Sequence, residues 1–444
     1  MIFHKSTKLA GGILSLMALI CLVRVLVADQ QPKKLSAIER DQAEGMLRDA
    51  RDAVKKYYYD PTFHGVDLDA RYREFDQRIK AAPEFNDALR MVAAFLSGLH
   101  DSHTYFVPPP RPYQWDYGFR IQLIGNTGFI SRLRPDTDAA SKLLAGDQIL
   151  GFNTYSVNRV DFHDLWYAFD TLMPQARVQL DVRDPDGKVR RVMVDSKFRE
   201  GKNVLDFTTG DDIFDYERRE EDEDHMVRQR YVEVGDIMIW KMPEFFLAND
   251  EVDHMFDVAR KKKTLILDLR GNPGGRVDTL EAMVGSVMDH DVTIATPVGR
   301  KKMKPLLAKS AGSHVFSGKL IVLVDSQSAS AAELFARVVQ IEHRGTVMGD
   351  LTSGSVMEAR GYTYQQGIDT IVPYAFSVTE ADLIMQDGKS LEHVGVTPDR
   401  EIIPTAQDLE AGRDPVLAQA IASAGGQVSP DDAGKMFPFE WASF

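Results

Sequence analysis

The chain has 444 residues, of which 44% are hydrophobic and 27% charged, and its formal net charge is −13 at pH 7. This length is enough for about two or three domains with their own cores, and the composition is ordinary for a globular protein. The excess of acidic residues argues against nucleic acid as the main partner, because binding to phosphates needs a basic surface.

Residues 1–28 predict an export signal. Lys5 and Lys8 precede an apolar stretch, and residues 26–28 (Leu-Val-Ala) fit a signal-peptidase site. Arg24 disfavours a stable membrane span, although an uncleaved segment that anchors the protein to a membrane stays open. The only cysteine, Cys21, lies here, so cleavage would leave a chain that needs no disulfide. We therefore expect the protein in the periplasm or at the cell surface of a bacterium.

Residues 36–110 predict a helical N-terminal region. Ser36 and Glu39 have the spacing of a capping box, and apolar residues follow at helical intervals. A second helix is expected over residues 85–99. The prolines of residues 108–112 then predict a linker.

Residues 115–198 predict a β-rich domain with short strands and two short helices. The order of these elements resembles a PDZ domain, in which a Gly-Phe loop holds the terminal carboxylate of a peptide and the peptide adds as a strand. Gly118 and Phe119 stand at the position of that loop, and residues 161–172 would form the longer helix. A PDZ-like spacer without affinity for peptides is the alternative.

Residues 201–410 predict an α/β layer domain, and residues 411–444 a C-terminal tail. The acidic stretch at 211–225 is typical of a solvated loop. From residue 231 on, strands and helices alternate, which is the pattern of a sheet covered by helices. The expected strands are 237–240, 265–269 and 320–324, and the expected helices are 250–260, 278–288 and 331–341.

Ser330 lies between the apolar strand and the helix that begins at residue 331. A hydroxyl at such a turn is close to unpaired backbone amides, which can hold an oxyanion. This position suits a serine nucleophile. A serine that only caps the helix is the common alternative.

Other segments favour the catalytic interpretation. Residues 264–275 form a second apolar strand that ends in a glycine-rich turn, whose backbone can approach a ligand closely. Residues 100–104 read His-Asp-Ser-His-Thr, and residues 392–399 read Glu-His-Val-Gly-Val-Thr-Pro-Asp. Together, over roughly residues 36–405, these motifs resemble the family of carboxy-terminal processing proteases and the tricorn core protease. Asp268 and Arg270 are expected to form a structural ion pair at the end of the strand.

The resemblance implies a crotonase- or ClpP-like catalytic core within a multidomain α/β protein. In the processing branch of the family a lysine is the base, but Ser355 stands at that position here. In the tricorn branch the base is a histidine preceded by a serine, and a late glutamate orients it. The roles implied for this sequence are Ser330 as nucleophile, His103 as base, Ser102 and Glu392 as orienting groups, and the amides of Ala331 and of Gly275 or Gly274 as the oxyanion hole.

These inferences predict an exported serine peptidase that acts on proteins or peptides by Ser-His chemistry. A catalytically inactive peptide- or ligand-binding scaffold of the same fold stays open because the lysine is missing, and an acyl-CoA enzyme is a weaker alternative. We expect no metal and no cofactor, since the sequence lacks metal-ligand spacing and a Gly-Lys-Thr phosphate loop. Formation of a homo-oligomer stays open.

Overall fold

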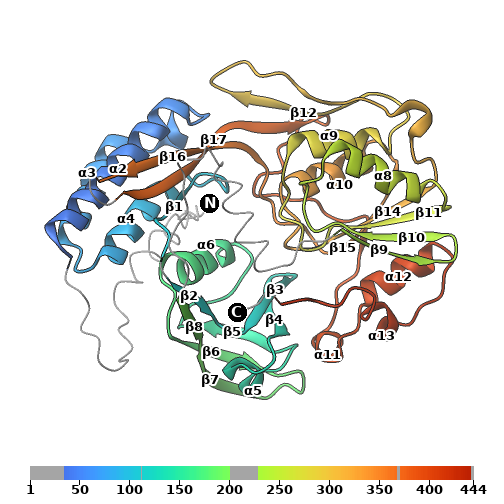
Figure 1. The fold of residues 1–444 in the computed structure, drawn as a ribbon, viewed down its shortest axis with the longest axis horizontal. Coiled ribbons are helices and arrows are strands. Elements are labelled where there is room, and N and C mark those ends of the chain that lie inside the picture. The colour runs from blue at the N-terminus through green and yellow to red at the C-terminus, as the bar shows by residue number, and fades with distance from the viewer. Residues whose placement is uncertain (1–34, 112, 201–228, 368–370, 442–444) are drawn as a thin grey trace, which may run out of the picture.

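The computed structural model describes residues 35–111, 113–200, 229–367 and 371–441 (Figure 1). The segments predicted as an export signal and as an acidic loop lie outside these ranges, so both stay predictions. In the described ranges, no helix combines the length and the apolar character needed to cross a membrane.

The N-terminal region consists of α2 (Ala37–Tyr57), α3 (Leu68–Ala81) and α4 (Phe85–Ser97). The predicted capping box opens α2: Ser36 N donates to the Glu39 carboxylate at 2.9 Å, and Glu39 N donates to Ser36 Oγ at 3.2 Å. The apolar faces of the helices share one buried cluster with Phe106 and Phe376, which belong to a β-sheet. The helical region therefore shares its core with strands that come later in the chain.

A five-stranded antiparallel sheet lies beside these helices, and the sequence patterns did not predict it. Strand β17 pairs with β1, β12 and β16, and β13 pairs with β12. Polar residues interrupt the apolar pattern of β16 and β17. A continuous apolar run, which indicates a buried strand, is therefore missing from both segments. The bounds are β1 (Tyr105–Val107), β12 (Val292–Gly299), β13 (Leu306–Ala308), β16 (Met357–Gln366) and β17 (Val372–Met385).

The β-rich domain has a five-stranded antiparallel sheet in the order β3-β4-β5-β6-β7, and we call it the β3–β7 domain. The predicted helix at 161–172 is shorter: α6 ends at Tyr167, and a wider helical turn, Ala168–Leu172, follows. A separate ribbon pairs β2 (Tyr113–Asp116) with β8 (Lys197–Glu200). The other elements are β3 (Phe119–Ile124), β4 (Thr127–Leu133), α5 (Asp138–Lys142), β5 (Gln148–Phe152), α6 (Phe162–Tyr167), β6 (Arg177–Arg183) and β7 (Val189–Asp195).

The α/β layer domain has a six-stranded sheet in the order β18-β15-β14-β11-β10-β9, which is parallel except for the β9–β10 pair. Its strands are β9 (Arg230–Val234), β10 (Ile237–Lys241), β11 (Thr264–Asp268), β14 (Lys319–Val324), β15 (Gly345–Gly349) and β18 (Arg400–Glu401). Its helices are α8 (Asn249–Ala259), α9 (Val277–Gly285), α10 (Ala331–Ile341), α11 (Ala406–Glu410), α12 (Pro415–Ser423) and α13 (Pro430–Ala433).

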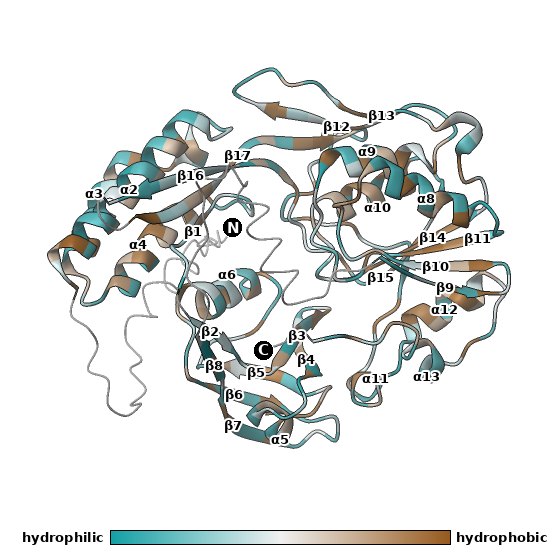
Figure 2. Ribbon diagram, in the orientation of Figure 1, coloured by the Kyte–Doolittle hydropathy of each residue, from teal (hydrophilic) through white to brown (hydrophobic). Residues whose placement is uncertain are grey.

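Both faces of this sheet are buried, and Figure 2 shows the hydrophobic residues gathered along its strands. Met238, Leu265 and Val322 lie in the cluster formed with α8, α9 and α10. Their neighbours, such as Ile266 and Leu323, lie in the cluster formed with α12 and α13. Parallel strands need cover on both faces. The prediction of a C-terminal tail at residues 411–444 is therefore wrong for the described part, because α12 and α13 supply the second helical layer.

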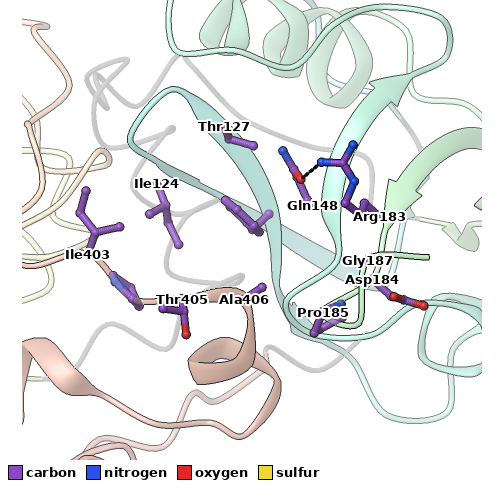
Figure 3. Close-up of a pocket in the computed structure, with 12 residues that line it drawn as sticks. Ile124, Thr127, Gln148, Arg183, Asp184, Pro185, Gly187, Ile403, Thr405 and Ala406 are labelled. Atoms are coloured by element: carbon purple, nitrogen blue, oxygen red, sulfur yellow. Dashed lines mark hydrogen bonds between the residues drawn. The ribbon is translucent and has the colours of Figure 1, made fainter. Parts of the chain in front are cut away.

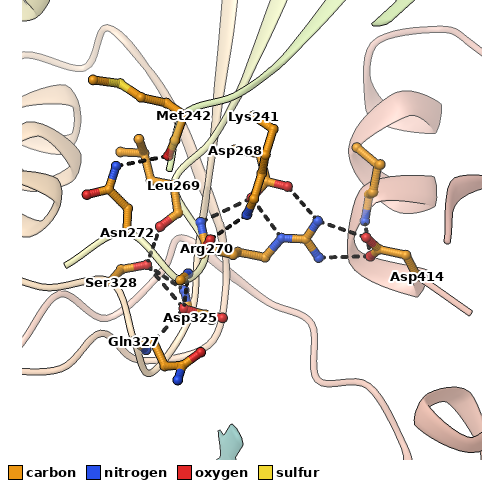
Figure 4. A network of polar contacts seen from close by, with 12 residues as sticks. Lys241, Met242, Asp268, Leu269, Arg270, Asn272, Asp325, Gln327, Ser328 and Asp414 are labelled. Carbon is orange, nitrogen blue, oxygen red and sulfur yellow. Dashed lines mark hydrogen bonds and ion pairs between the residues drawn. The ribbon is translucent and has the colours of Figure 1, made fainter. Parts of the chain in front are cut away.

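A partly buried ion network, centred on the buried Asp268, joins the ends of β10 and β11 to α12 (Figure 4). Arg270 donates to Asp268 at 2.7 Å and to Asp414 at 2.8 Å, and Lys241 Nζ donates to Asp268 at 3.3 Å. Burial alone would raise the pKa of Asp268, but the charges of Arg270 and Lys241 hold that pKa well below its usual range. The predicted Asp268–Arg270 pair is confirmed, and it extends to the carboxylate that caps α12 at Leu417 N.

Replacing Arg270 by methionine should lower the free energy of unfolding by about 3–5 kcal/mol, because the charge of Asp268 would stay buried without its main partner. Urea unfolding followed by circular dichroism measures this loss. Arg191→Met is the matched control, since Arg191 pairs with Asp181 on an exposed face, where a pair contributes about 0–1 kcal/mol. Equal losses in the two variants would contradict a structural role for the network.

Candidate active site

Ser330 occupies the turn between β14 and α10 in a backbone conformation that side chains rarely tolerate, with φ 52° and ψ −117°. Such a conformation costs on the order of 1–3 kcal/mol and persists only where the surroundings hold it. The Ser330 side chain makes no capping hydrogen bond to the helix. The Glu333 carboxylate caps the turn instead, accepting from Ser330 N at 3.1 Å. Ser330 is therefore not the simple helix cap of the alternative interpretation.

The turn that carries Ser330 is clamped to the glycine-rich turn after β11 (Figure 4). Asp325 Oδ1 accepts from Gly271 N at 2.9 Å. Ala329 N, just before Ser330, donates to the backbone oxygen of Asn272 at 2.9 Å. Two motifs that are separate in the sequence therefore meet at the carboxyl ends of neighbouring parallel strands.

Gly274 passes close to Ser330, and Gly275 passes close to the backbone of Phe245, which their lack of a side chain permits. A Cβ atom on Gly274 would lie 2.6 Å from Cβ of Ser330, and φ is 103° at Gly274 and 139° at Gly275. Gly274 N already donates to Asn272 Oδ1 at 2.8 Å. Because the Gly274 amide is engaged, Gly275 is the remaining candidate of this pair for an oxyanion donor beside Ala331, the first residue of α10.

His103, Ser102 and Glu392 form a continuous hydrogen-bonded relay. Ser102 Oγ lies 2.7 Å from His103 Nδ1 and donates to Glu392 Oε2 at 2.9 Å. Because the hydroxyl gives its single proton to Glu392, it accepts a proton from Nδ1, which leaves the Nε2 lone pair to act as a base. Burial lowers the pKa of His103, and the charge of Glu392 opposes that shift. A lowered pKa favours the neutral imidazole, which is the form that a general base requires.

The relay is joined to Ser330 by one short backbone segment. Ser330 N donates to the oxygen of Ser355 at 2.9 Å, and the next amide, Val356 N, donates to Glu392 Oε2 at 2.8 Å. Ser102 N also donates to Glu392 Oε1 at 2.7 Å, which fixes the carboxylate from a second side. Ser355 occupies the position of the lysine base of the processing branch. Its contribution to the site is its backbone carbonyl, which accepts the hydrogen bond from Ser330 N.

Glu333 is a candidate functional residue that the sequence interpretation missed. Its buried carboxylate accepts from Thr352 Oγ1, Gly354 N, Ser355 N and Ser330 N. Burial raises the pKa of Glu333 to about 7, although these hydrogen bonds act to lower it. Its position three residues after Ser330 is the capping-box spacing, which is the signal that could have revealed it.

Asp101 was also missed, although it stands next to Ser102. Its Oδ1 accepts from His103 N at 3.0 Å and from Thr379 Oγ1 at 2.6 Å. Thr379 belongs to β17, so this carboxylate fastens the histidine loop to the five-stranded sheet. Asp101 therefore positions the loop and is not itself part of the relay.

The expected peptide-binding residues, Gly118 and Phe119, lie in the β3–β7 domain and not among these groups. Gly118 N already donates to Asp116 Oδ1 at 2.8 Å, and the Phe119 side chain is buried in the domain core. A Cβ atom on Gly118 would also lie 2.6 Å from Thr137 Oγ1. These two residues therefore shape the start of β3, and the Gly118 amide is already engaged.

A cavity of about 380 Å³ lies where the β3–β7 domain meets residues 403–406 (Figure 3). Its lining includes Ile124, Arg183 and Ile403, and none of the candidate catalytic residues. We therefore do not assign the candidate active site to this cavity. Among the residues that the structure describes, no group of three or more His, Cys, Asp or Glu could hold a metal ion.

Two family models match the chain: peptidase family S41 at residues 233–402 and the tricorn protease C1 domain at residues 40–93. The chain is 26% identical over 400 residues to a putative tricorn protease homolog 2 from Streptomyces coelicolor, covering 84% of this chain and 31% of that protein. It is 27% identical over 165 residues to a carboxy-terminal-processing protease from Bartonella bacilliformis, covering 36% of each. The chain thus spans about a third of the length of these curated relatives.

Among solved structures, the crystal structure of mature CPAF has a similar fold. The TM-score is 0.62 at 16% sequence identity, and the match covers 84% of this chain and 95% of that one. At this identity the likeness concerns the fold alone. It supports a multidomain mixed α/β architecture of the kind found in this family of peptidases.

Replacing Glu333 by glutamine should reduce kcat/KM by at least about tenfold and lower the free energy of unfolding by about 1–3 kcal/mol. In glutamine, an NH2 group replaces one carboxylate oxygen. Its N–H donors would then face backbone N–H groups that donate to the carboxylate in the wild-type protein. Hydrolysis of unfolded casein and urea unfolding measure the two effects. Glu410→Gln, at an exposed position, is the control. Unchanged activity in Glu333→Gln would show that Glu333 does not position Ser330.

Proposed function

We propose that this chain, whose residues 233–402 belong to peptidase family S41, is a serine peptidase that cleaves proteins or peptides by a Ser-His mechanism. The observation that carries the proposal is the relay from His103 through Ser102 to Glu392, which is joined by the Ser355–Val356 backbone to the strained turn at Ser330. A nucleophile, a base and a group that orients the base are the parts that acyl transfer needs.

In the proposed mechanism, Ser330 Oγ attacks the carbonyl carbon of the peptide bond while His103 Nε2 takes its proton. The amides of Ala331 and Gly275 donate to the oxyanion of the tetrahedral intermediate. His103 then gives the proton to the leaving amine, and a water molecule hydrolyses the acyl-enzyme by the same steps. Ser102 and Glu392 hold the imidazole in place, and the carboxylate charge stabilises the imidazolium that forms.

We further propose that the β3–β7 domain is PDZ-like and delivers peptides to the site. Strand β3 is an edge of its sheet, so an extended peptide can add to it. Its far end contacts the turn that leads to Ser330: Ser326 Oγ donates to the Leu123 oxygen at 2.6 Å, and Gln122 Nε2 donates to Asp325 Oδ2 at 3.2 Å. A peptide that follows β3 would therefore run toward the nucleophile.

An inactive binding scaffold is the second candidate, because Ser355 stands in place of the lysine of the processing branch. A fluorophosphonate probe separates the two, since it labels only an activated serine. The matched control is Ser328→Ala, which removes a nearby hydroxyl. We expect the probe to label both the wild type and this variant. We expect no labelling of Ser330→Ala, whose casein hydrolysis should fall by about a thousandfold or more. An unlabelled wild-type protein would favour the scaffold.

The acid limb of the kcat/KM profile should lie below the ordinary histidine pKa of about 6.5. Burial lowers the pKa of His103. Only the neutral imidazole can accept the proton of Ser330, so a lower pKa extends activity to lower pH. Rates of peptide hydrolysis between pH 4 and 8 measure the profile. Glu392→Gln should shift this limb further toward low pH, since it removes the charge that favours the imidazolium. A shift toward high pH would contradict the relay.

A further inference from the structure

The backbone just before the catalytic relay is held by two histidine rings that take no part in the relay. His64 Nδ1 lies 2.8 Å from the backbone oxygen of Leu99. His393 Nε2 lies 2.9 Å from the backbone oxygen of the next residue, His100. Because a carbonyl oxygen can only accept, each ring donates from the nitrogen named here. Two consecutive carbonyls at the start of the histidine loop, residues 99–104, are therefore bound by side chains from distant parts of the chain.

The three histidines at this junction share a backbone conformation that residues other than glycine rarely adopt. The φ angle is 53° at His64, 55° at His100 and 58° at His393. Such a conformation persists only where the surroundings hold it. At His64 the backbone N–H donates to Asp60 Oδ2 at 2.6 Å, and the Tyr59 hydroxyl lies 2.8 Å from the ring Nε2. This ring is thus held at both nitrogens, with Nδ1 facing the loop.

His393 also connects the histidine loop to the backbone beside Ser330. Its backbone N–H donates to the Gly354 oxygen at 2.7 Å, and Gly354 N donates to Glu333 at 2.8 Å. Its ring Nε2 lies 3.5 Å from Glu392 Oε1, a second acceptor that also favours a hydrogen on this nitrogen. One residue therefore contacts both the histidine loop and the loop that is bound to the Ser330 turn.

We propose that His64 and His393 are positioning residues, which set the distance from His103 to Ser330 through their hydrogen bonds to the histidine loop. The inference rests on the proposed function, because it takes His103 as the base of Ser330. Proton transfer needs the two groups within hydrogen-bond reach, and a displacement of about 1 Å can cost about a hundredfold in rate. Asp101 holds the loop from the side of the five-stranded sheet, and the two rings hold it from two other sides.

Asparagine and glutamine can replace the two ring nitrogens separately. The amide nitrogen of asparagine lies where Nδ1 lies in histidine, and the longer glutamine places its amide nitrogen near the position of Nε2. We expect His393→Gln to keep kcat within about twofold of the wild type and His393→Asn to lower it about tenfold or more. At position 64 the order should reverse, so that His64→Asn keeps kcat and His64→Gln lowers it. Asparagine tolerates a positive φ at least as well as histidine, so backbone strain does not explain this pattern.

Hydrolysis of fluorescein-labelled casein gives kcat and KM for the four variants. KM should change by less than about twofold, because the variants remove no contact to the substrate. His254→Asn is the matched control: His254 is exposed on α8, and its replacement should leave kcat unchanged. The midpoint of thermal unfolding should stay within about 3 °C of the wild type in every variant.

The same order of kcat at both positions, full activity in all four variants, or a change confined to KM would overturn the proposal. The rate of fluorophosphonate labelling should follow kcat, since labelling needs the same activated serine but no peptide. A labelled wild type with unaffected variants would refute the positioning role alone. A wild type that is neither labelled nor active would refute the peptidase proposal, and the positioning role with it.

Discussion

The buried contacts of Arg270 fix the point from which the active-site turns depart. One guanidinium satisfies Asp268 at the end of β11 and Asp414 at the start of α12, so the two elements cannot move apart without leaving a charge unpaired in the interior. The glycine-rich turn begins directly after Arg270. The ion pairs of Arg270 therefore hold the backbone at the start of this turn, and the turn in turn forms hydrogen bonds with the Ser330 turn.

The strained backbone at Ser330 is held by a carboxylate and not by the helix alone. Glu333 collects hydrogen bonds from Ser330 N and from the loop at residues 352–355, so Ser330 and the loop are fixed to the same two oxygen atoms. The same loop leads to Val356 N, which binds Glu392. Ser330 and the His103–Ser102–Glu392 relay are therefore both held by one shared piece of backbone, although they lie far apart in the sequence.

The β3–β7 domain is attached at the same loop. Arg159 donates to Asp350 at 2.9 Å and to the Thr352 oxygen at 3.2 Å, and Gly125 N also donates to Asp350, at 2.8 Å. Thr352 is one of the donors to Glu333. Any displacement of the domain must move or break these bonds, so its position is coupled mechanically to the backbone beside Ser330. Residues 437–441 are a second connection between the same two parts, because Phe437 packs on the α12–α13 cluster and the Trp441 ring lies 4.6 Å from the guanidinium of Arg134.

The sequence alone determined the elements with strong local signals: the capping box of α2, the buried strands β11 and β14, and helix α10, whose apolar spacing fixes its length. Its resemblance to the tricorn branch of the family also singled out Ser330, His103, Ser102 and Glu392, because their motifs match that family's pattern position by position. Only the tertiary structure decided what depends on contacts between distant residues. Strands β16 and β17 are interrupted by polar residues and become a sheet only through pairing and the cover of α2. Helices α12 and α13 form a second layer because the second face of the parallel sheet has to be buried. Local spacing accounts for the contact of Glu333 with Ser330 N and of Asp101 with His103 N, but the contacts of Glu333 with residues 352–355 and of Asp101 with Thr379 depend on the tertiary structure.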